Sequence, residues 1–318
     1  MLNERKGGNG LSSFDISRTP PLSVQDGRSS RPLPPGESAP PPQEPAQPVI
    51  RVRGLRKSYG AKQVLKGIDL EAYPGQIIGY IGPNGAGKST TQKLMLGLEQ
   101  GYDGYIEVLG HDISDGSSEY KARIGYVPET AEIYDMLTAR EYLAFSGQLY
   151  GLPREAAERK AERLLALFGL EEMVDRRIDA FSKGMRQKVM LSAAVLHDPD
   201  VLFLDEPLSG LDAGSVAVVK EILARLAARG KAIFYSSHIM DVVEKISSRI
   251  VLLHDGKVAA DGSFAELQAR SEGGSLERIF TRMTGFHEQE AIAERFCGTV
   301  AMTPEQLAEE ASGENERP

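Results

Sequence analysis

A glycine-rich segment is the part of the sequence best suited to bind phosphate. Residues 82–90 read Gly-Pro-Asn-Gly-Ala-Gly-Lys-Ser-Thr and fit the pattern G-x-x-x-x-G-K-[ST]. Glycines allow successive main-chain N–H groups to turn inward around phosphate oxygens, and an expected helix at 90–98 adds its positive dipole end. The residues expected to bind a nucleotide here are Gly82, Pro83, Asn84, Gly85, Ala86, Gly87, Lys88, Ser89 and Thr90.

Two of these side chains have specific expected roles. Lys88 would reach the β- and γ-phosphates of the nucleotide, and Ser89 would hold Mg²⁺. The alternative interpretation is a glycine-rich turn with an incidental lysine. The position of the segment, directly after the apolar run 77–81, favours phosphate binding because the pattern normally joins a strand to a helix.

Two carboxylates follow a second apolar run. Residues 201–204 are all apolar, and Asp205 and Glu206 come directly after them. A carboxylate at the end of so apolar a strand needs a partner to offset its burial. We therefore expect Asp205 to ligate Mg²⁺ and Glu206 to accept a proton from an attacking water. Taken alone, Glu206 would be an ordinary surface residue at a strand end.

The elements that must position these residues alternate between strands and helices. Strand patterns occur at 50–55, 63–70 and 76–81, and again after Pro199 at 201–204 and 232–236. A hairpin of 250–253 and 258–260 is expected around Asp255-Gly256. Because strands alternate with helices, the sequence predicts an α/β fold with a mainly parallel sheet.

The stretch from about residue 130 to 198 reads as a helical insert in that pattern. Thr138 and Glu141 have the spacing of a capping box, Pro153 suits the start of a helix, and Gly169 stands just past a run of helical period. Three or so helices are expected here. The sequence contains no internal repeat, so one domain with an insert is the simplest organisation.

A third motif gives the chain a family resemblance. Residues 181–187 read Phe-Ser-Lys-Gly-Met-Arg-Gln, where Ser182 suits the cap of a helix running to His197 and Gly184 leaves the backbone open to an anion. With residues 82–90 and Asp205-Glu206, this motif resembles the signature, usually L-S-G-G-Q, of the ATP-binding subunits of ABC transporters. The resemblance covers about residues 50–285. Alone, the motif would be an ordinary capped helix.

The resemblance implies a fold, cofactors and further site residues. The fold is a P-loop NTPase (RecA-like) core with a mainly parallel sheet, an N-terminal antiparallel β-subdomain and a helical insert. The protein would be an ATPase that uses ATP and Mg²⁺. The further residues expected at the site are Tyr59 stacked on adenine, Ser182, Gly184 and Gln187 of the signature, Asp212 of the segment 209–212 that crosses a dimer seam, and His238 on the γ-phosphate.

One position departs from the family pattern. After the strand-like residues 123–128 the family usually has a Gln that senses Mg²⁺ and relays to the transporter, whereas this chain has Glu129. A carboxylate can still ligate Mg²⁺ or hold a water, so the metal-binding role is carried over to Glu129. The sequence around Glu129 and the signature variant look most like the subgroup serving ABC-2-type exporters, including Ecs-type ATPases.

The resemblance also implies partners. The signature surface would bind the γ-phosphate of ATP held by a second ATP-binding subunit, so that two sites form in a head-to-tail homodimer or heterodimer. The pair would energise export through a separate integral membrane permease, from the cytoplasmic face of the membrane. An import ATPase of the same family and a soluble ABC ATPase acting on ribosomes or DNA are the alternatives. The chain has one cassette and no sustained heptads, which disfavours the soluble alternatives.

Composition agrees with an intracellular protein that does not bind nucleic acid. The formal net charge of -8 and the sequence pI of about 5.4 leave no large basic surface. The single Cys297 excludes an intrachain disulfide framework. No apolar run approaches the ~18 residues of a membrane span, and the first thirty residues lack a secretory apolar region.

The two ends of the chain differ from the rest. Residues 1–48 hold ten of the eighteen prolines, which predicts a disordered leader, with a Pro-rich partner-binding segment as the alternative. The ATP-binding domain is expected at 49–285. Residues 286–318 carry eight Glu and two Arg, which predicts an acidic, solvated or partly helical tail.

Overall fold

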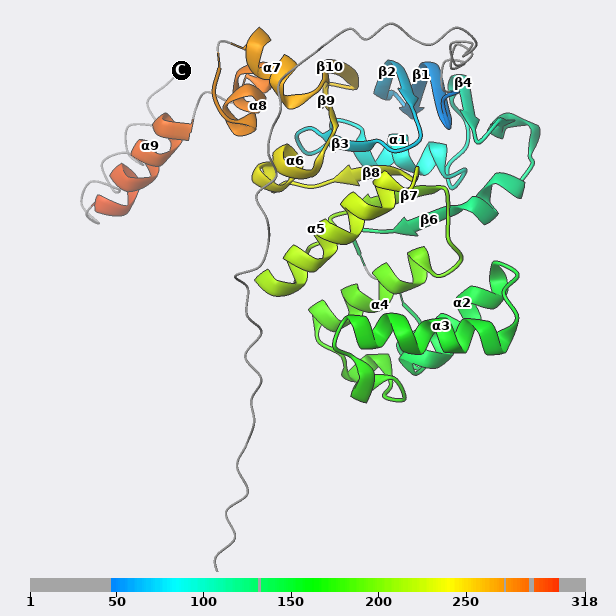
Figure 1. Cartoon of the computed structure of the whole chain (residues 1–318). Helices are drawn as coiled ribbons and strands as arrows, with labels where there is room; N and C mark the ends of the chain where they lie inside the picture. Colours follow the sequence, from blue (N-terminus) through cyan, green and yellow to red (C-terminus); the bar gives the residue numbers. More distant parts are fainter. Residues whose placement is uncertain (1–46, 131–132, 272, 286–288, 303–318) are drawn as a thin grey trace, which may run out of the picture. The chain divides into compact units, whose positions relative to one another are not determined.

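The computed structural model describes residues 47–130, 133–271, 273–285 and 289–302, and these contain two β-sheets (Figure 1). The expected leader, and most of the expected acidic tail, lie outside the described residues. The smaller sheet is antiparallel, with the strand order β2-β1-β4-β5. Its strands are β1 (Ile50–Tyr59), β2 (Lys62–Ala72), β4 (Asp103–Val108) and β5 (His111–Asp112). It is the antiparallel β-subdomain that the family resemblance implies.

The larger sheet has the strand order β10-β9-β3-β8-β7-β6, and only the β9–β10 pair in it is antiparallel. Its strands are β3 (Ile77–Ile81), β6 (Ile124–Val127), β7 (Val201–Asp205), β8 (Ala232–Ser236), β9 (Arg249–His254) and β10 (Lys257–Gly262). The prediction of a mainly parallel sheet is confirmed. Asp255 and Gly256 both have positive φ angles, as a two-residue hairpin turn requires.

Alternate residues of the central strands bury two different faces. Phe203 and Phe234 pack 5.0 Å apart, centroid to centroid, in a core shared with the antiparallel sheet and α1 (Lys88–Met95). Leu202 and Ile233 point to the opposite core, shared with helices that follow the sheet strands. Each such buried side chain contributes about 1.5–3 kcal/mol. Those helices include α5 (Ala213–Ala228), α6 (Met240–Ile246), α7 (Phe264–Arg270) and α8 (Leu276–Thr284).

The helical insert consists of three α-helices with a core of their own. They are α2 (Ala139–Leu149), α3 (Arg154–Leu167) and α4 (Lys183–Val195). Thr138 and Glu141 form the expected capping box, and Pro153 directly precedes α3. Among the described residues, the 3₁₀ turns Glu171–Met173 and Ile178–Ala180 connect α3 to α4, whereas Ile113–Asp115 and Glu119–Arg123 lie between β5 and β6. A last helix, α9 (Gln289–Ala301), lies in the expected tail.

Two contacts join the insert to the strand that precedes Glu129. A Cβ atom added at Gly125 of β6 would lie 2.2 Å from the main-chain oxygen of Ala194, so α4 packs directly on the strand backbone. Nε2–H of His197 donates to the main-chain oxygen of Ile124 at 3.0 Å, and its ring stacks on Tyr150 with centroids 3.6 Å apart. Burial lowers the pKa of His197, which favours the neutral form of this imidazole.

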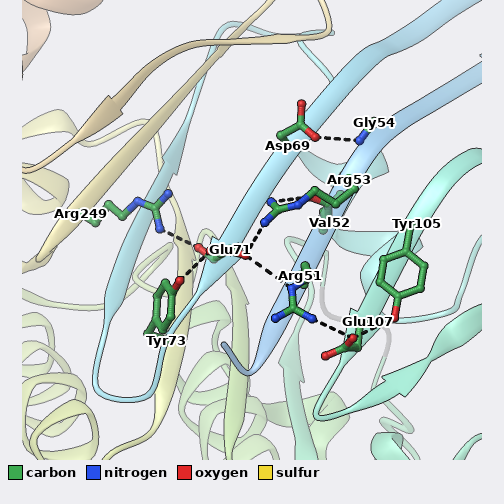
Figure 2. A network of polar contacts seen from close by, with 10 residues as sticks. All are labelled: Arg51, Val52, Arg53, Gly54, Asp69, Glu71, Tyr73, Tyr105, Glu107 and Arg249. Carbon is green, nitrogen blue, oxygen red and sulfur yellow. Dashed lines mark hydrogen bonds and ion pairs between the residues drawn. The ribbon is translucent and has the colours of Figure 1, made fainter. Parts of the chain in front are cut away.

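A polar network joins the two sheets beside Glu71 of β2 (Figure 2). The Glu71 carboxylate accepts a 2.6 Å hydrogen bond from the Tyr73 hydroxyl and pairs with Arg53. Arg249 of β9 donates to the main-chain oxygen of Glu71 at 2.6 Å and binds Asp261 through two nitrogens. The Tyr73 hydrogen bond, followed by Arg53, lowers the pKa of Glu71. The network thereby joins β2 of the antiparallel sheet to β9 of the larger sheet, and the larger sheet carries the candidate site.

The two largest differences between the predicted and the observed element boundaries concern α1 and β1. The helix after the glycine-rich segment runs from Lys88 to Met95 rather than over 90–98, and Gly97 has a positive φ of 62° that no helix continues through. The first strand continues to Tyr59 instead of ending at Leu55, and register shifts between Leu55 and Arg56 and between Lys57 and Ser58 interrupt the alternating pattern of this additional stretch.

Candidate functional site

The glycine-rich segment joins the end of β3 to the start of α1, as predicted. A Cβ atom at Gly82 would lie 2.5 Å from the main-chain oxygen of Leu253, and one at Gly87 would lie 2.4 Å from Leu65. Gly87 also has a φ of 106°, which favours glycine. The ammonium group of Lys88 donates to the main-chain oxygens of Gly82 at 2.7 Å and Pro83 at 3.3 Å, so the lysine spans the loop.

A cavity of about 290 Å³ is lined by ten of the residues predicted at the site, whereas Gly82, Pro83 and Ala86 of the glycine-rich segment are not in its lining. We call it the phosphate cavity. Its lining is Lys62, Val64, Asn84, Gly85, Gly87, Lys88, Ser89, Thr90, Glu129, Asp205, Glu206 and His238. Lys62 and Val64 were not among the predicted site residues, and they come from β2 of the antiparallel sheet. No pattern along the chain marked them, since they reach the cavity only through sheet packing.

The electrostatics of the phosphate cavity suit an anionic ligand bound with a cation. Burial of the ammonium group lowers the pKa of Lys88 below its ordinary value, and the carboxylates of Asp205, Glu206 and Glu129 oppose that shift. Three carboxylates and two lysines, Lys62 and Lys88, therefore line the same cavity. A triphosphate alone would be repelled by the carboxylates, whereas a divalent cation beside it would be attracted.

Asp205 is held rigidly at the end of β7. It is buried, and its Oδ1 atom accepts a hydrogen bond of 2.5 Å from the hydroxyl of Ser236 on the neighbouring strand β8. Gln92 of α1 donates to the same Ser236 oxygen at 3.4 Å. This chain of contacts fixes the carboxylate and leaves its other oxygen for another partner.

Glu206 has the unusual backbone conformation of the site. Its φ of 48° lies in the left-handed region, which costs a non-glycine residue free energy and is found most often at functional sites. Its carboxylate accepts hydrogen bonds from the Ser237 hydroxyl at 3.1 Å and from the main-chain N–H of His238 at 2.7 Å. The Nε2 atom of His238 lies 3.8 Å from Oε1 of Glu206. Two neighbouring strand ends thus fix one carboxylate.

The donor set of the phosphate cavity fits Mg²⁺. Ser89, Asp205 and Glu129 all line it and offer oxygen atoms, which are the ligands that Mg²⁺ prefers. In the part of the chain that the structure describes, no group of three or more His, Cys, Asp or Glu residues could hold a metal alone. This is expected of a site where one or two carboxylates and the substrate phosphates share the ion.

The structure separates the signature residues from the phosphate cavity. Ser182 caps α4, its hydroxyl accepting from the N–H of Met185 at 3.2 Å. The side chain of Gln187 is buried and donates to the main-chain oxygen of Pro207 at 3.0 Å. Among the described residues that line the phosphate cavity, none comes from 181–187. A second cavity, of about 520 Å³, is lined by Glu129, Thr130, Phe181, Lys183, Arg186, Gln187, Glu206 and Ser209.

Tyr59 and Asp212 are also absent from the lining of the phosphate cavity. Tyr59 is 46% exposed at the end of β1, and the ammonium group of Lys57 lies 4.8 Å from its ring centroid. Asp212 caps α5, accepting from the N–H of Ser215 at 2.9 Å and from its hydroxyl at 2.6 Å. Their expected roles toward adenine and across a dimer seam stay predictions.

The fold and the phosphate cavity together define a P-loop nucleotidase. The sequence profile of the ABC transporter family matches residues 65–209. The ATP-binding protein EcsA of Bacillus subtilis is 33% identical over 74% of this chain and 96% of its own length. A Nod factor export ATP-binding protein of Paraburkholderia xenovorans is 34% identical over 73% of this chain and 76% of its own length.

A solved ATP-binding subunit of an ABC transporter superposes with a TM-score of 0.70, at 34% identity over 74% of this chain and 99% of that chain. The chain belongs to the family of ABC transporter ATP-binding subunits. It is an ATP-binding, ATP-hydrolysing subunit of a transporter, and the predicted likeness to Ecs-type ATPases is confirmed. No helix among the described residues is long and apolar enough to cross a membrane.

Proposed function

We propose that this chain is one half of a Mg²⁺-dependent ATPase dimer that drives export through a separate integral membrane permease. The observation that carries the proposal is the convergence of Lys88, Asp205, Glu206 and His238 on one cavity, while Ser182, at the start of the signature helix, is not part of its lining. Each chain therefore offers a phosphate-binding half and a separate anion-receptive half. In a head-to-tail pair, the phosphate-binding half of each chain would meet the anion-receptive half of the other chain, so that two complete sites form.

In the proposed nucleotide complex the residues divide into binding and catalytic groups. Tyr59 stacks on adenine, and Lys88 with the loop amides binds the β- and γ-phosphates. Ser89, Asp205 and Glu129 would hold Mg²⁺, which supplies charge neutralisation at the phosphates. The Ser236 hydroxyl keeps the Asp205 carboxylate in place for this role.

Glu206 is the proposed catalytic base. Its carboxylate is only 18% exposed and is oriented by Ser237 and the His238 N–H, so it can accept a proton from a water without first reorienting. The imidazole of His238 is 56% exposed and stands at the open side of the cavity, where it would contact the γ-phosphate. Ser182 and Gly184 of the partner cassette would complete the site from across the seam.

An exposed aromatic patch is the proposed docking surface for the permease. It consists of the exposed Tyr134, Met136 and Phe145 with the half-buried Tyr142, from the segment before α2 and from α2 itself. The rings of Tyr134 and Phe145 meet edge to face at 6.0 Å, and Tyr134 is 65% exposed. Such a patch on a soluble surface favours an apolar partner. It follows Glu129 closely along the chain, so nucleotide state and permease contact would be coupled.

Export and a location at the cytoplasmic face follow from the same proposal. One relative is named for the export of Nod factor, and the likeness to Ecs-type ATPases agrees with an ABC-2-type exporter. The permease would tether the subunit to the membrane. The purification described next also distinguishes a homodimer from a heterodimer, because a different second cassette would co-purify with the chain.

The test is purification of the tagged chain from its own cells in mild detergent. We expect an integral membrane protein to co-purify with the parent chain and to be lost from the double variant Tyr134→Ala/Phe145→Ala. Leu167→Ala, which removes another exposed apolar side chain, serves as the matched control and should retain the partner. Recovery of ribosomes or DNA in place of a membrane protein would contradict the transport proposal.

A further inference from the structure

A hydrogen bond joins the start of α4 to the turn that follows Glu206. The ammonium group of Lys183 donates to the hydroxyl of Ser209 at 2.6 Å. Lys183 is the first residue of α4, directly after Ser182, and Ser209 stands three residues after Glu206. The bond therefore connects the signature of this chain to the turn that begins at its own proposed catalytic base.

Two further contacts bring the same segments together. A Cβ atom at Gly184 would lie 2.5 Å from the main-chain oxygen of Gly210, so the two backbones touch. One turn further along α4, Gln187 donates to the main-chain oxygen of Pro207 at 3.0 Å. Because residues four apart share a helix face, Lys183 and Gln187 hold both ends of the turn 207–209.

The charge of Lys183 is not explained by an ion pair. A cation in the first turn of a helix opposes the helix dipole, and the first turn of α4 contains no acidic residue to compensate. Among the described residues, the contact of the Lys183 ammonium is the neutral Ser209 hydroxyl. Because the helix dipole disfavours a positive charge at this position, we infer that the hydrogen bond donated by the Lys183 side chain has a role.

The turn held by Lys183 includes the strained backbone of Glu206. The N–H of Ser209 donates to the main-chain oxygen of Glu206 at 3.1 Å, and Glu206 has the positive φ described above. A strained residue keeps its conformation only when its surroundings hold it there. Fixing Ser209 through Lys183 therefore helps to keep the Glu206 carboxylate aimed at the phosphate cavity.

We propose that Lys183 is a positioning residue for Glu206 and acts through Ser209. This inference rests on the proposed role of Glu206. It adds a physical link between the two ATP sites of the proposed dimer. In the proposed head-to-tail dimer, the signature of a chain touches the ATP of the partner while Glu206 serves the chain's own ATP. The Lys183–Ser209 bond then makes hydrolysis in one site depend on engagement of the signature in the other.

A double-mutant cycle in ATP turnover tests the inference on the purified chain. Lys183→Ala and Ser209→Ala should each lower kcat about fivefold, the effect of losing one hydrogen bond of ordinary net strength, with KM for ATP unchanged. The double variant should be no slower than either single variant, because both remove the same bond. Lys183→Arg should restore most of kcat, since arginine also reaches and donates to Ser209.

The control is Lys245→Ala, which removes an exposed lysine that pairs with Asp241 on α6 and should leave kcat unchanged. A normal kcat for Ser209→Ala beside a slow Lys183→Ala would overturn the inference and assign Lys183 to direct contact with nucleotide. Additive losses in the double variant would overturn it too. A failure of Glu206→Gln to abolish hydrolysis would instead reject the proposed function, so the two failures are distinguishable.

Discussion

The main-chain N–H of His238 donates a 2.7 Å hydrogen bond to Oε1 of Glu206, and the imidazole of the same histidine lies 3.8 Å from that oxygen. The ends of the neighbouring strands β7 and β8 are thereby joined at the cavity that Lys88 and Asp205 also line. A base oriented in advance by main-chain donors needs little reorganisation during reaction. The roles proposed for the cavity residues lead to the following predictions.

Replacement of Lys88 should abolish tight nucleotide binding. In Lys88→Ala we expect ATP affinity to fall at least about 30-fold, because a desolvated charged contact to phosphate is lost. Binding of a fluorescent ATP analogue measures this loss. Lys245→Ala, an exposed lysine far along the chain, should bind like the parent. Equal affinity of Lys88→Ala and the parent would exclude the phosphate role.

The pH dependence of ATP binding should reflect the same lysine. Burial lowers the pKa of Lys88, so in the nucleotide-free protein its ammonium group deprotonates at a lower pH than an ordinary lysine. Binding requires the charged form. Affinity should therefore decrease as pH rises toward that lowered pKa, and the decrease should be absent from Lys88→Ala. An affinity that stays constant up to about pH 10 would contradict the expected role.

Glu129 should set the Mg²⁺ requirement of the ATPase. We expect Glu129→Ala to raise the Mg²⁺ concentration for half-maximal activity several-fold, because one of the oxygen donors at the cavity is lost. Glu129→Gln keeps a neutral oxygen donor and should fall between the parent and Glu129→Ala. Steady-state ATPase assays over a Mg²⁺ titration provide the measurement. Identical titration curves for all three proteins would remove Glu129 from the metal site.

Tyr59 should contribute to affinity through its ring alone. Tyr59→Ala is expected to weaken ATP binding about 2- to 12-fold, the equivalent of ~0.5–1.5 kcal/mol of aromatic stacking, whereas Tyr59→Trp should keep it. Isothermal titration with ATP and with inorganic triphosphate, which has no base to stack, separates base stacking from phosphate contacts. A loss in Tyr59→Trp as large as in Tyr59→Ala would show that stacking is not the role of this residue.

The close packing of α4 on β6 should contribute to the stability of the protein. Gly125→Ala places a methyl group against the Ala194 backbone, and we expect it to cost about 1–3 kcal/mol. Gly298→Ala in α9 is the matched control, because nothing lies near its added Cβ atom, and it should be neutral or slightly stabilising. Thermal unfolding of both variants gives the comparison, and an unchanged Tm for Gly125→Ala would contradict the packing.

The sequence predicted the parts of the site that lie in one local stretch. Residues 82–90 and Asp205-Glu206 have motifs because a loop between a strand and a helix must contain those residue types in that order. Two kinds of contact were not predictable, because they join segments far apart along the chain. They are the positions of Lys62 and Val64 in the cavity lining and the hydrogen bond between Lys183 and Ser209. The end of β1 was misplaced because register shifts after Leu55 and after Lys57 interrupt the alternation on which strand prediction depends.

The shared ATP site is tested most directly by the association state of Glu206→Gln in the presence of ATP and Mg²⁺, measured by light scattering on a sizing column. We expect this variant to have nearly lost hydrolysis and to form a stable ATP-dependent dimer, whereas with ADP it should stay monomeric. Lys88→Ala added to it should abolish the dimer. A Glu206→Gln protein that hydrolyses ATP at the parent rate, or stays monomeric with ATP bound, would contradict the account.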